Sequence, residues 1–286
     1  MKLHAIDTGF FKLDGGAMFG VVPKSIWNKL NPADADNLCS WALRCLLIED
    51  GKRLILVDTG IGNKQDAKFL GHYRLHGDHS LDESLQAKGF TRQDITDVFL
   101  THLHFDHCGG AIIRKGEELV PAFPNANFWS NEKHWAWATE PNEREKASFL
   151  KENILPIQDS GRLKMVPMKG ETGEGSVPVS FADGFSIHFV NGHTNAMMLP
   201  QLDYKGRTIV FMADLLPSAA HLPVPYIMAY DMFPLTSLNE KKEFLEEALT
   251  GDYILFFEHD PVNECCTLQK TEKGIRAKDF FSLKDL

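Results

Sequence analysis

The pattern of apolar and polar positions predicts strands in the first part of the chain. WALRCLLIED (41–50) and KRLILVDTG (52–60) are apolar runs on either side of a turn signal at Gly51. SLDESLQAKGF (80–90) then has the spacing of a helix, in which Ser80 and Glu83 form a capping box and Gly89 ends the helix. We therefore expect a strand-rich segment followed by a helix, and then a strand that ends at DVFL (97–100).

The second part of the chain repeats this order. We expect a helical region over about 131–155 that is broken near Pro141, followed by strands over 185–190, 197–204 and 207–214. A helix over 239–249 has a capping box at Ser237 and Glu240, and a buried strand (253–260) and an edge strand (264–269) follow it. The glycine-rich segment 169–178 is predicted to be a mobile surface loop. Strands followed by helices, twice over, favour two packed sheets with helices outside.

The most unusual polar cluster is THLHFDHCGG (101–110), directly after the apolar DVFL. In an extended segment His102, His104 and Asp106 project to the same side, and His107 follows as the chain turns. Imidazole and carboxylate groups are ligands suited to zinc and its first-row neighbours. A solvated histidine-rich loop is the alternative, but polar groups after a buried strand are costly unless they are paired. The cluster predicts a metal site.

Three further candidate ligands lie at the ends of predicted strands. FSIHFVNGHT leads to His193, TIVFMAD ends at Asp214, and YILFFEH ends at His259. Each one alone could be a buried polar residue with a structural partner. Strand ends are positions from which a rigid scaffold presents ligands, so the repeated arrangement favours one shared site.

Composition and charge restrict the class of partner. The chain has 286 residues and a net charge of −9, and it has no dense Lys/Arg block. This balance argues against binding to nucleic acid or to an anionic membrane. The five cysteines are an odd number without framework spacing, no segment resembles a signal peptide, and none has the apolar length of a membrane span. We expect reduced thiols and a cytoplasmic protein.

The ordered series T-H-x-H-x-D-H-x-G-G, G-H-T, A-D and a late histidine, together with VDTG at 57–60, resembles the metallo-β-lactamase superfamily. The similarity is greatest to its branch of quorum-signal lactonases and organophosphate hydrolases. This resemblance implies an α/β fold, a four-layer αββα sandwich made of two similar halves. It also implies a single domain over 1–286, in which residues 1–40 form an N-terminal extension that packs near the active site.

The resemblance also implies the ligand set of a two-metal site. His102, His104 and His193 would hold the first ion. Asp106, His107 and His259 would hold the second ion. Asp214 would bridge the two ions, and Asp58 would orient a ligand histidine from outside. We expect two divalent ions, zinc first, with iron or manganese as alternatives.

Such a site predicts an enzyme, a dinuclear metal-dependent hydrolase. Two bound ions activate a water near neutral pH and stabilise charge on a carbonyl or phosphoryl oxygen. Asp106 and Asp214 are the catalytic candidates, with Asp106 as the proton acceptor. The expected substrate is a small molecule, a lactone or another carboxylic ester. The alternative is a phosphotriester or phosphodiester hydrolase with the same site. The third hypothesis is a non-catalytic metal-binding protein, which would require that catalysis was lost while all the ligands were kept. A homodimer is compatible with the sequence.

The substrate pocket is less well defined by the sequence. The resemblance places Phe105 of HLHFDH, and Met18 and Phe19 of the segment 12–27, near the substrate, although core packing explains them equally well. Lactonases of this branch carry a tyrosine three positions after the bridging aspartate, where this chain has Pro217. They also continue G-H-T with P-G-H, where this chain reads GHTNAMM. Candidates for the missing hydrogen-bond donor are His221, Tyr226 and Tyr230.

Overall fold

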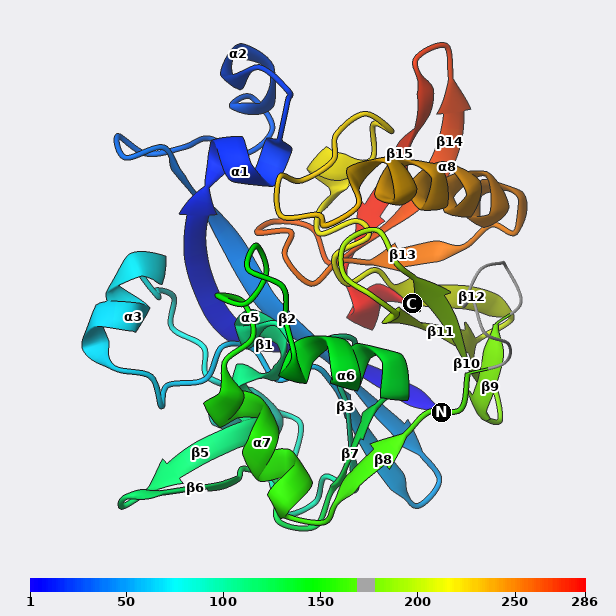
Figure 1. Cartoon of the computed structure of the whole chain (residues 1–286). Coiled ribbons are helices and arrows are strands. Elements are labelled where there is room, and N and C mark those ends of the chain that lie inside the picture. Colours follow the sequence, from blue (N-terminus) through cyan, green and yellow to red (C-terminus); the bar gives the residue numbers. More distant parts are fainter. Residues whose placement is uncertain (169–177) are drawn as a thin grey trace. The chain divides into compact units, whose positions relative to one another are not determined.

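The computed structural model describes residues 1–168 and 178–286 (Figure 1), so the predicted loop at 169–178 lies, except for its last residue, outside the described residues. The chain is divided into two compact units. The first unit contains Met1–Gly9 and Leu43–Met168, and the second contains Phe10–Ala42 and Lys169–Leu286. The division falls within two long strands, β1 (Lys2–Asp14) and β2 (Leu38–Asp50). The expected single domain with an N-terminal extension stays a prediction.

The first unit is built on a sheet whose strand order is β1-β2-β3-β4-β7-β8. Its remaining strands are β3 (Arg53–Val57), β4 (Asp97–Phe99), β7 (Asn127–Ser130) and β8 (Leu163–Met165). The predicted hairpin at Gly51 is confirmed, since β2 and β3 pair antiparallel and Gly51 has a φ of 58°. From β3 to β8 the strands are parallel, and β5 (Ile112–Lys115) and β6 (Glu118–Pro121) form a separate hairpin.

Helices of the first unit bury apolar side chains against its strands. They are α3 (Ala67–Tyr73), α4 (Leu81–Ala87), α5 (Phe105–Cys108), α6 (Glu132–Thr139) and α7 (Lys151–Asp159), with a short 3-10 turn η1 (Gly109–Ala111). Ser80 caps α4 as predicted, because its hydroxyl accepts from the Glu83 amide at 3.3 Å and donates to the Glu83 carboxylate at 2.7 Å. Leu85 of α4 and Ile157 of α7 are fully buried, and each stabilises the fold by about 1.5–3 kcal/mol. In Figure 1, α7 packs beside β5 and β6.

The second unit has a seven-stranded sheet in the order β15-β14-β13-β12-β11-β10-β9. The strands are β9 (Val179–Ala182), β10 (Phe185–Val190), β11 (Met197–Tyr204), β12 (Arg207–Phe211), β13 (Ile254–Phe256), β14 (Cys265–Thr271) and β15 (Gly274–Phe281). Because β10 and β12 are both antiparallel to β11, and β13 is parallel to β12, the strands β10, β12 and β13 run in one direction. Their carboxyl ends therefore lie at the same edge of the sheet.

Two predictions for this part of the chain are wrong. Segment 264–269 is not an edge strand, because a tight turn ending at Gly274 (φ 91°) returns the chain and β15 covers β14. Helix α8 (Pro234–Thr250) begins five residues before the predicted start, since proline at its first position is preorganised for a helix. Ser237 and Glu240 therefore lie inside α8 and form no capping box there.

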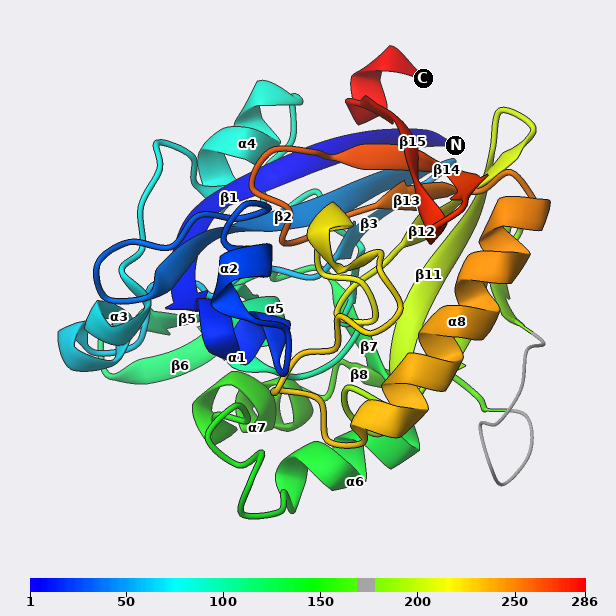
Figure 2. The same cartoon turned by 90° about the horizontal axis from the view of Figure 1, so that it is seen from above.

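Helix α8 runs along the sheet of the second unit (Figure 2) and buries Phe244 and Leu245. The other helices of this unit are α1 (Gly15–Phe19), α2 (Lys24–Trp27) and two 3-10 turns, η2 (Ala219–His221) and η3 (Leu283–Asp285). Among the described residues, none of the helices has the length and apolar character to cross a membrane. The five cysteines are free and buried, as expected for reduced thiols.

Candidate metal centre

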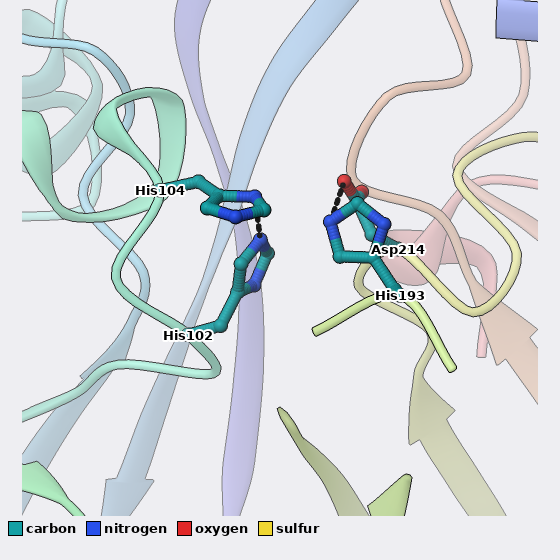
Figure 3. A group of neighbouring side chains, drawn as sticks. All are labelled: His102, His104, His193 and Asp214. Carbon is teal, nitrogen blue, oxygen red and sulfur yellow. Dashed lines mark hydrogen bonds and ion pairs between the residues drawn. The ribbon is translucent and has the colours of Figure 1, made fainter. Parts of the chain in front are cut away.

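The candidate ligands of the first unit follow β4 on a short connection into α5. His102 and His107 are fully buried, and His104 and Asp106 are nearly so. The Nε2 atom of His102 faces the Nδ1 atom of His104 at 3.1 Å (Figure 3), and the Nε2 atom of His107 lies 3.8 Å from an Asp106 oxygen. The structure therefore brings together the four sequence-predicted ligands of this unit as two pairs.

Each histidine of this group uses its outer nitrogen to donate a hydrogen bond. The Nε2 atom of His104 donates to the buried Glu145 carboxylate at 3.0 Å. The Nδ1 atom of His102 lies 3.1 Å from the Thr101 hydroxyl, which accepts because it donates its own proton to Asp58 at 2.6 Å. These partners fix the tautomers, so each inner nitrogen carries a lone pair suited to a metal.

Asp58 holds the connection between β4 and α5 through both of its carboxylate oxygens. One carboxylate oxygen accepts from the Thr101 amide at 2.8 Å, and the other lies 3.1 Å from the Nδ1 atom of His107. Asp58 has a φ of 58°, a left-handed conformation that is strained for a residue other than glycine and that is typical of functional sites. The sequence placed Asp58 beside a ligand histidine, and the structure identifies that histidine as His107.

The two glycines after His107 are required by close backbone packing. A Cβ atom on Gly109 would lie 2.1 Å from the Ile61 carbonyl oxygen, and one on Gly110 would lie 2.1 Å from the Thr59 carbonyl oxygen. The amide of Thr59 also donates to the His107 carbonyl at 2.8 Å. The VDTG segment and the ligand loop therefore lie against each other, and this contact orients His107.

In the second unit, His193, Asp214 and His259 each follow one of the three strands that end at the same sheet edge. The two oxygens of Asp214 point to different histidines: Oδ2 lies 3.1 Å from the Nε2 atom of His193, and Oδ1 lies 3.3 Å from the Nε2 atom of His259. Figure 3 shows the first of these pairs. Their outer nitrogens are held as in the first unit, His193 by Asp231 at 2.9 Å and His259 by the Ala42 carbonyl at 2.7 Å.

Helix α8 positions the segment that carries His193. The Glu240 carboxylate accepts from the amides of Asn191 and Gly192 at 2.7 and 2.9 Å. Gly192 packs so closely on α8 that an added Cβ atom would lie 2.2 Å from the Ser237 hydroxyl. Ser237 and Glu240, which the sequence predicts as a capping box, thus contact the backbone just before His193 instead.

Sequence reasoning missed three residues that hold the candidate ligands: Glu145, Asp231 and Glu240. Asp231 lies in the connection between β12 and α8, and Glu145 lies in the connection between α6 and α7. Glu145 follows no apolar run, and the apolar residues 226–230 before Asp231 form no strand, so the strand-end signal that identified the ligands does not apply to them. Glu240 lies in a helix with many exposed charges, and its sequence does not distinguish this half-buried carboxylate from the exposed ones.

The donor atoms within each unit suit a tetrahedral divalent ion. Such an ion, about 2.1 Å from two nitrogen or oxygen donors, sets those donors about 3.4 Å apart. The observed separations are 3.1 Å for His102 with His104, 3.1 Å for His193 with Asp214, and 3.3 Å for His259 with Asp214. Two lone pairs that face each other at 3.1 Å, as in His102 and His104, repel unless a cation lies between them. The residues present therefore fit a bound metal.

Residues predicted for the substrate pocket have several roles. Met18 and Phe19 are buried, and Phe19 stacks on His221 with ring centres 4.7 Å apart. His221 uses both ring nitrogens, one toward the Ser218 hydroxyl at 2.8 Å and one toward the Met18 carbonyl at 2.9 Å. Burial lowers the pKa of His221 to about 3, so the ring is neutral and has no N–H left for a substrate. Tyr226 is half-buried, edge-on to Phe19.

Phe105, the aromatic residue inside the ligand motif, belongs to a three-ring cluster with α3. Its ring centre lies 4.6 Å from Tyr73 and 5.4 Å from Phe69. Burial and the nearby charge of Asp106 raise the pKa of Tyr73 to about 12.

Two other groups singled out in the sequence are not part of the site. Burial raises the pKa of the Cys108 thiol to about 12, and its sulfur donates to the Leu103 carbonyl, as expected for a small core residue. His72, His76 and His79 are exposed, and none of them belongs to a cluster suited to a metal among the described residues.

Comparison with known families agrees with this geometry. The sequence profile of the Metallo-beta-lactamase superfamily matches residues 44–259, which include all the candidate ligands. The chain belongs to the metallo-β-lactamase superfamily. The predicted resemblance and the α/β fold class are thereby confirmed, and the protein is an enzyme of a metal-dependent hydrolase superfamily. None of the curated proteins compared with the chain matches it.

Solved structures with the same fold cover nearly the whole chain. A probable metal-dependent hydrolase from Staphylococcus aureus has 26% identity and a TM-score of 0.86, covering 98% of this chain and 96% of its own. AidC, a dizinc quorum-quenching lactonase in complex with the product N-hexanoyl-L-homoserine, has 21% identity and a TM-score of 0.77, covering 98% and 95%. The hydrolase AbOPH has 22% identity and a TM-score of 0.76, covering 98% and 94%.

Proposed function

We propose that this superfamily member is a dinuclear metal-dependent hydrolase that opens lactones or cleaves other carboxylic esters. His102, His104 and His193 would hold one ion, and Asp106, His107 and His259 the other, with Asp214 bridging. The observation that carries the proposal is the geometry of Asp214, whose two oxygens face two different histidines at 3.1 and 3.3 Å. A carboxylate that binds two ions needs this arrangement, whereas a simple ion pair does not.

The bound ions would supply an activated water and stabilise the charge that develops on the substrate oxygen. The chain's own residues prepare this chemistry. Asp58, Glu145 and Asp231 hold the histidine rings, so little rotation is needed when the ions bind. Asp106 would accept the proton of the attacking water and pass it to the leaving oxygen.

The choice of a lactone is supported by residues of the first unit and by the neighbouring structures. Phe69 packs edge-on against Phe105 beside the ligand loop, and this apolar aromatic pair suits a substrate with carbon-rich substituents. Several solved structures of this fold are lactone hydrolases, and we extend that substrate class to this chain as part of the proposal. Zinc is the proposed metal, since imidazole and carboxylate ligands suit it. A cytoplasmic location and a homodimer stay predictions.

The experiment is proton release at constant pH by the zinc-loaded protein. N-acyl-homoserine lactones, γ-butyrolactone and a phosphotriester of similar size would be offered separately. Lactone opening that disappears in Asp214→Ala supports the proposal. Turnover of the phosphotriester alone would replace it with the organophosphate alternative, and no turnover of any substrate by protein containing two ions would reject both.

A further inference from the structure

A groove on the surface of the first unit is separate from the candidate ligands. Its volume of about 740 Å³ is in the range of small-molecule binding sites. The residues that line it come from different parts of the unit, and none of them is a candidate metal ligand; they lie at 63–64, 82, 86, 90–93 and 113–114. The metal centre therefore does not account for this groove.

The charged side chains of the groove are mostly cations. Lys64, Arg92 and Arg114 line it, and Asp82 is the acidic residue of the lining. The Asp82 carboxylate accepts hydrogen bonds from the Nε and Nη2 atoms of Arg92, the second at 3.1 Å, so it offsets the charge of Arg92. Within 1–168 and 178–286, neither Lys64 nor Arg114 forms an ion pair. The groove therefore keeps two unpaired positive charges in a chain whose net charge is −9.

Lys64 is charged at neutral pH although it is only 7% exposed. Its ammonium donates to the Gly109 carbonyl, which uses one of its three N–H groups. The other two have no acceptor among the residues that the structure describes. Burial lowers the pKa of Lys64 to about 8, and the charge of Arg114 adds to this effect, whereas Cys108 and Glu152 oppose it. A buried ammonium with two free donors is stabilised by an anion beside it.

Arg92 is a second preorganised donor. Its guanidinium lies over the Phe123 ring, 5.4 Å from the ring centre, and the ion pair with Asp82 restrains it further. In the described part of the chain, its Nη1 atom is buried and has no hydrogen-bond partner. Because Lys64 and Arg92 are already held by the protein, an anion that binds them loses little of its affinity to side-chain ordering.

A phosphate group fits this set of charges. It carries a charge of about −1.5 to −2 at pH 7, which matches the two unpaired cations. Lysine binds phosphate as a point charge, and arginine offers a planar fork to two phosphate oxygens. Phe90 and Ile113, both half-buried, add apolar surface to the lining, which suits the organic part of a phosphate ester.

We infer that this groove is a second binding site of the protein, which takes a phosphate group, either as free phosphate or as the phosphate ester of a small molecule. Lys64 and Arg114 bind the phosphate oxygens, and Arg92 adds positive charge beside them. The inference does not depend on the proposed function, because it uses no metal ligand and no step of the hydrolysis.

The test is calorimetric titration of the full zinc-loaded chain with inorganic phosphate, AMP, adenosine and succinate. We expect saturable binding of phosphate or AMP with a Kd below about 1 mM. Succinate, a dianion without a phosphate group, and adenosine should each bind at least about tenfold more weakly. A lower Kd for AMP than for phosphate identifies the ester as the ligand, and the reverse identifies free phosphate. The same titration after removal of the metal by a chelator should give the same Kd.

Arg114→Gln and Lys64→Met should each raise the Kd by at least about tenfold, because each removes a charged donor. The matched control is Lys115→Gln, the next position of β5, which is exposed and outside the groove lining. It should leave the Kd within about twofold, since an exposed charge is screened by salt. Circular dichroism checks the fold, and exposed Arg114 keeps the test decisive if Lys64→Met does not fold.

Four results would overturn the inference. The first is no saturable binding of phosphate or AMP by the unchanged protein. The second is an unchanged Kd in Arg114→Gln, or an equal rise in Lys115→Gln. The third is succinate or adenosine binding as tight as that of the phosphate probes. The fourth is binding that disappears when the metal is removed, because the anion would then occupy the metal centre.

Discussion

The candidate ligands of the two units are assembled in different ways. In the first unit four ligands lie within six positions of one connection, from His102 to His107. In the second unit three ligands are 21 and 45 positions apart, at 193, 214 and 259, and the sheet brings them to one edge. The local chemistry is nevertheless the same, since the candidate histidines of both units donate outward and turn an inner nitrogen toward another candidate ligand. Outer partners, and not chain proximity, determine the orientation of the rings.

Removal of Asp214 should have the largest effect, because this residue faces both histidines of its unit. We expect Asp214→Ala to lower kcat/KM by at least about 10³-fold and to reduce the metal content. The measurements are initial rates and elemental analysis after gel filtration. Asp203→Ala, at an exposed aspartate of β11, is the control and should match the unchanged protein. Activity of Asp214→Ala within about tenfold of the unchanged protein would refute the bridging role.

Asp58→Asn and Asp231→Asn test whether the two units orient their histidines in the same way. Each change removes the charge that holds a ring nitrogen but keeps the size of the side chain, and asparagine tolerates the left-handed φ at position 58. We expect each to weaken metal affinity or activity by about 10–100-fold. Competition with a zinc chelator gives the affinity. An effect in only one unit would show that the two sets of outer partners are not equivalent.

Glu240→Gln should have an intermediate effect that is specific to the second unit. The carboxylate accepts from two backbone amides before His193, and hydrogen bonds to charged groups are worth about 1.5–3 kcal/mol. We expect lower thermal stability and activity reduced by about tenfold. Activity and melting temperature are measured together, and Glu246→Gln on the exposed side of α8 is the control. Loss of stability with full activity would mean that Glu240 supports α8 and not His193.

One prediction concerns stability and not activity, namely a pH dependence at Lys241. Its ammonium donates to the carbonyls of His221, Pro223 and Tyr226, and burial lowers its pKa to about 7. Since the folded pKa is below the ordinary value of 10.5, the unfolded chain binds more protons between these values, and the stability contribution rises with pH.

The stability of the unchanged protein relative to Lys241→Met should therefore increase from pH 7 to pH 10, by at most about 1.4 kcal/mol per pH unit. Urea unfolding across this range gives the difference. A constant difference would mean that the three carbonyls keep the ammonium charged throughout.

The same contrast between the units explains what the sequence could predict. His102, His104, Asp106 and His107 form a contiguous pattern, and apolar runs mark the strands that precede His193, Asp214 and His259. Apart from Asp58, which the family resemblance implied, the partners of these histidines could not be predicted, because their positions depend on tertiary packing that leaves no periodic signal.

The boundary errors have local causes. The sequence predicts the start of α8 too late because Leu235 in its first turn is 76% exposed, whereas a helix pattern expects an apolar residue to be buried. The last strand, β15, mixes three charged residues with apolar ones and is largely exposed, so its sequence resembles a surface segment. Its pairing with β14 follows from the turn before Gly274 and not from its own composition.

The central claim, that the ligands of both units together hold two ions, is tested most directly by metal stoichiometry. Apo protein would be titrated with zinc by calorimetry, and the content would be confirmed by elemental analysis, for the unchanged chain and for His104→Ala and His259→Ala. We predict two ions per chain in the unchanged protein and about one in each variant at equal free zinc. One ion or none in the unchanged protein, or two in both variants, would contradict the account.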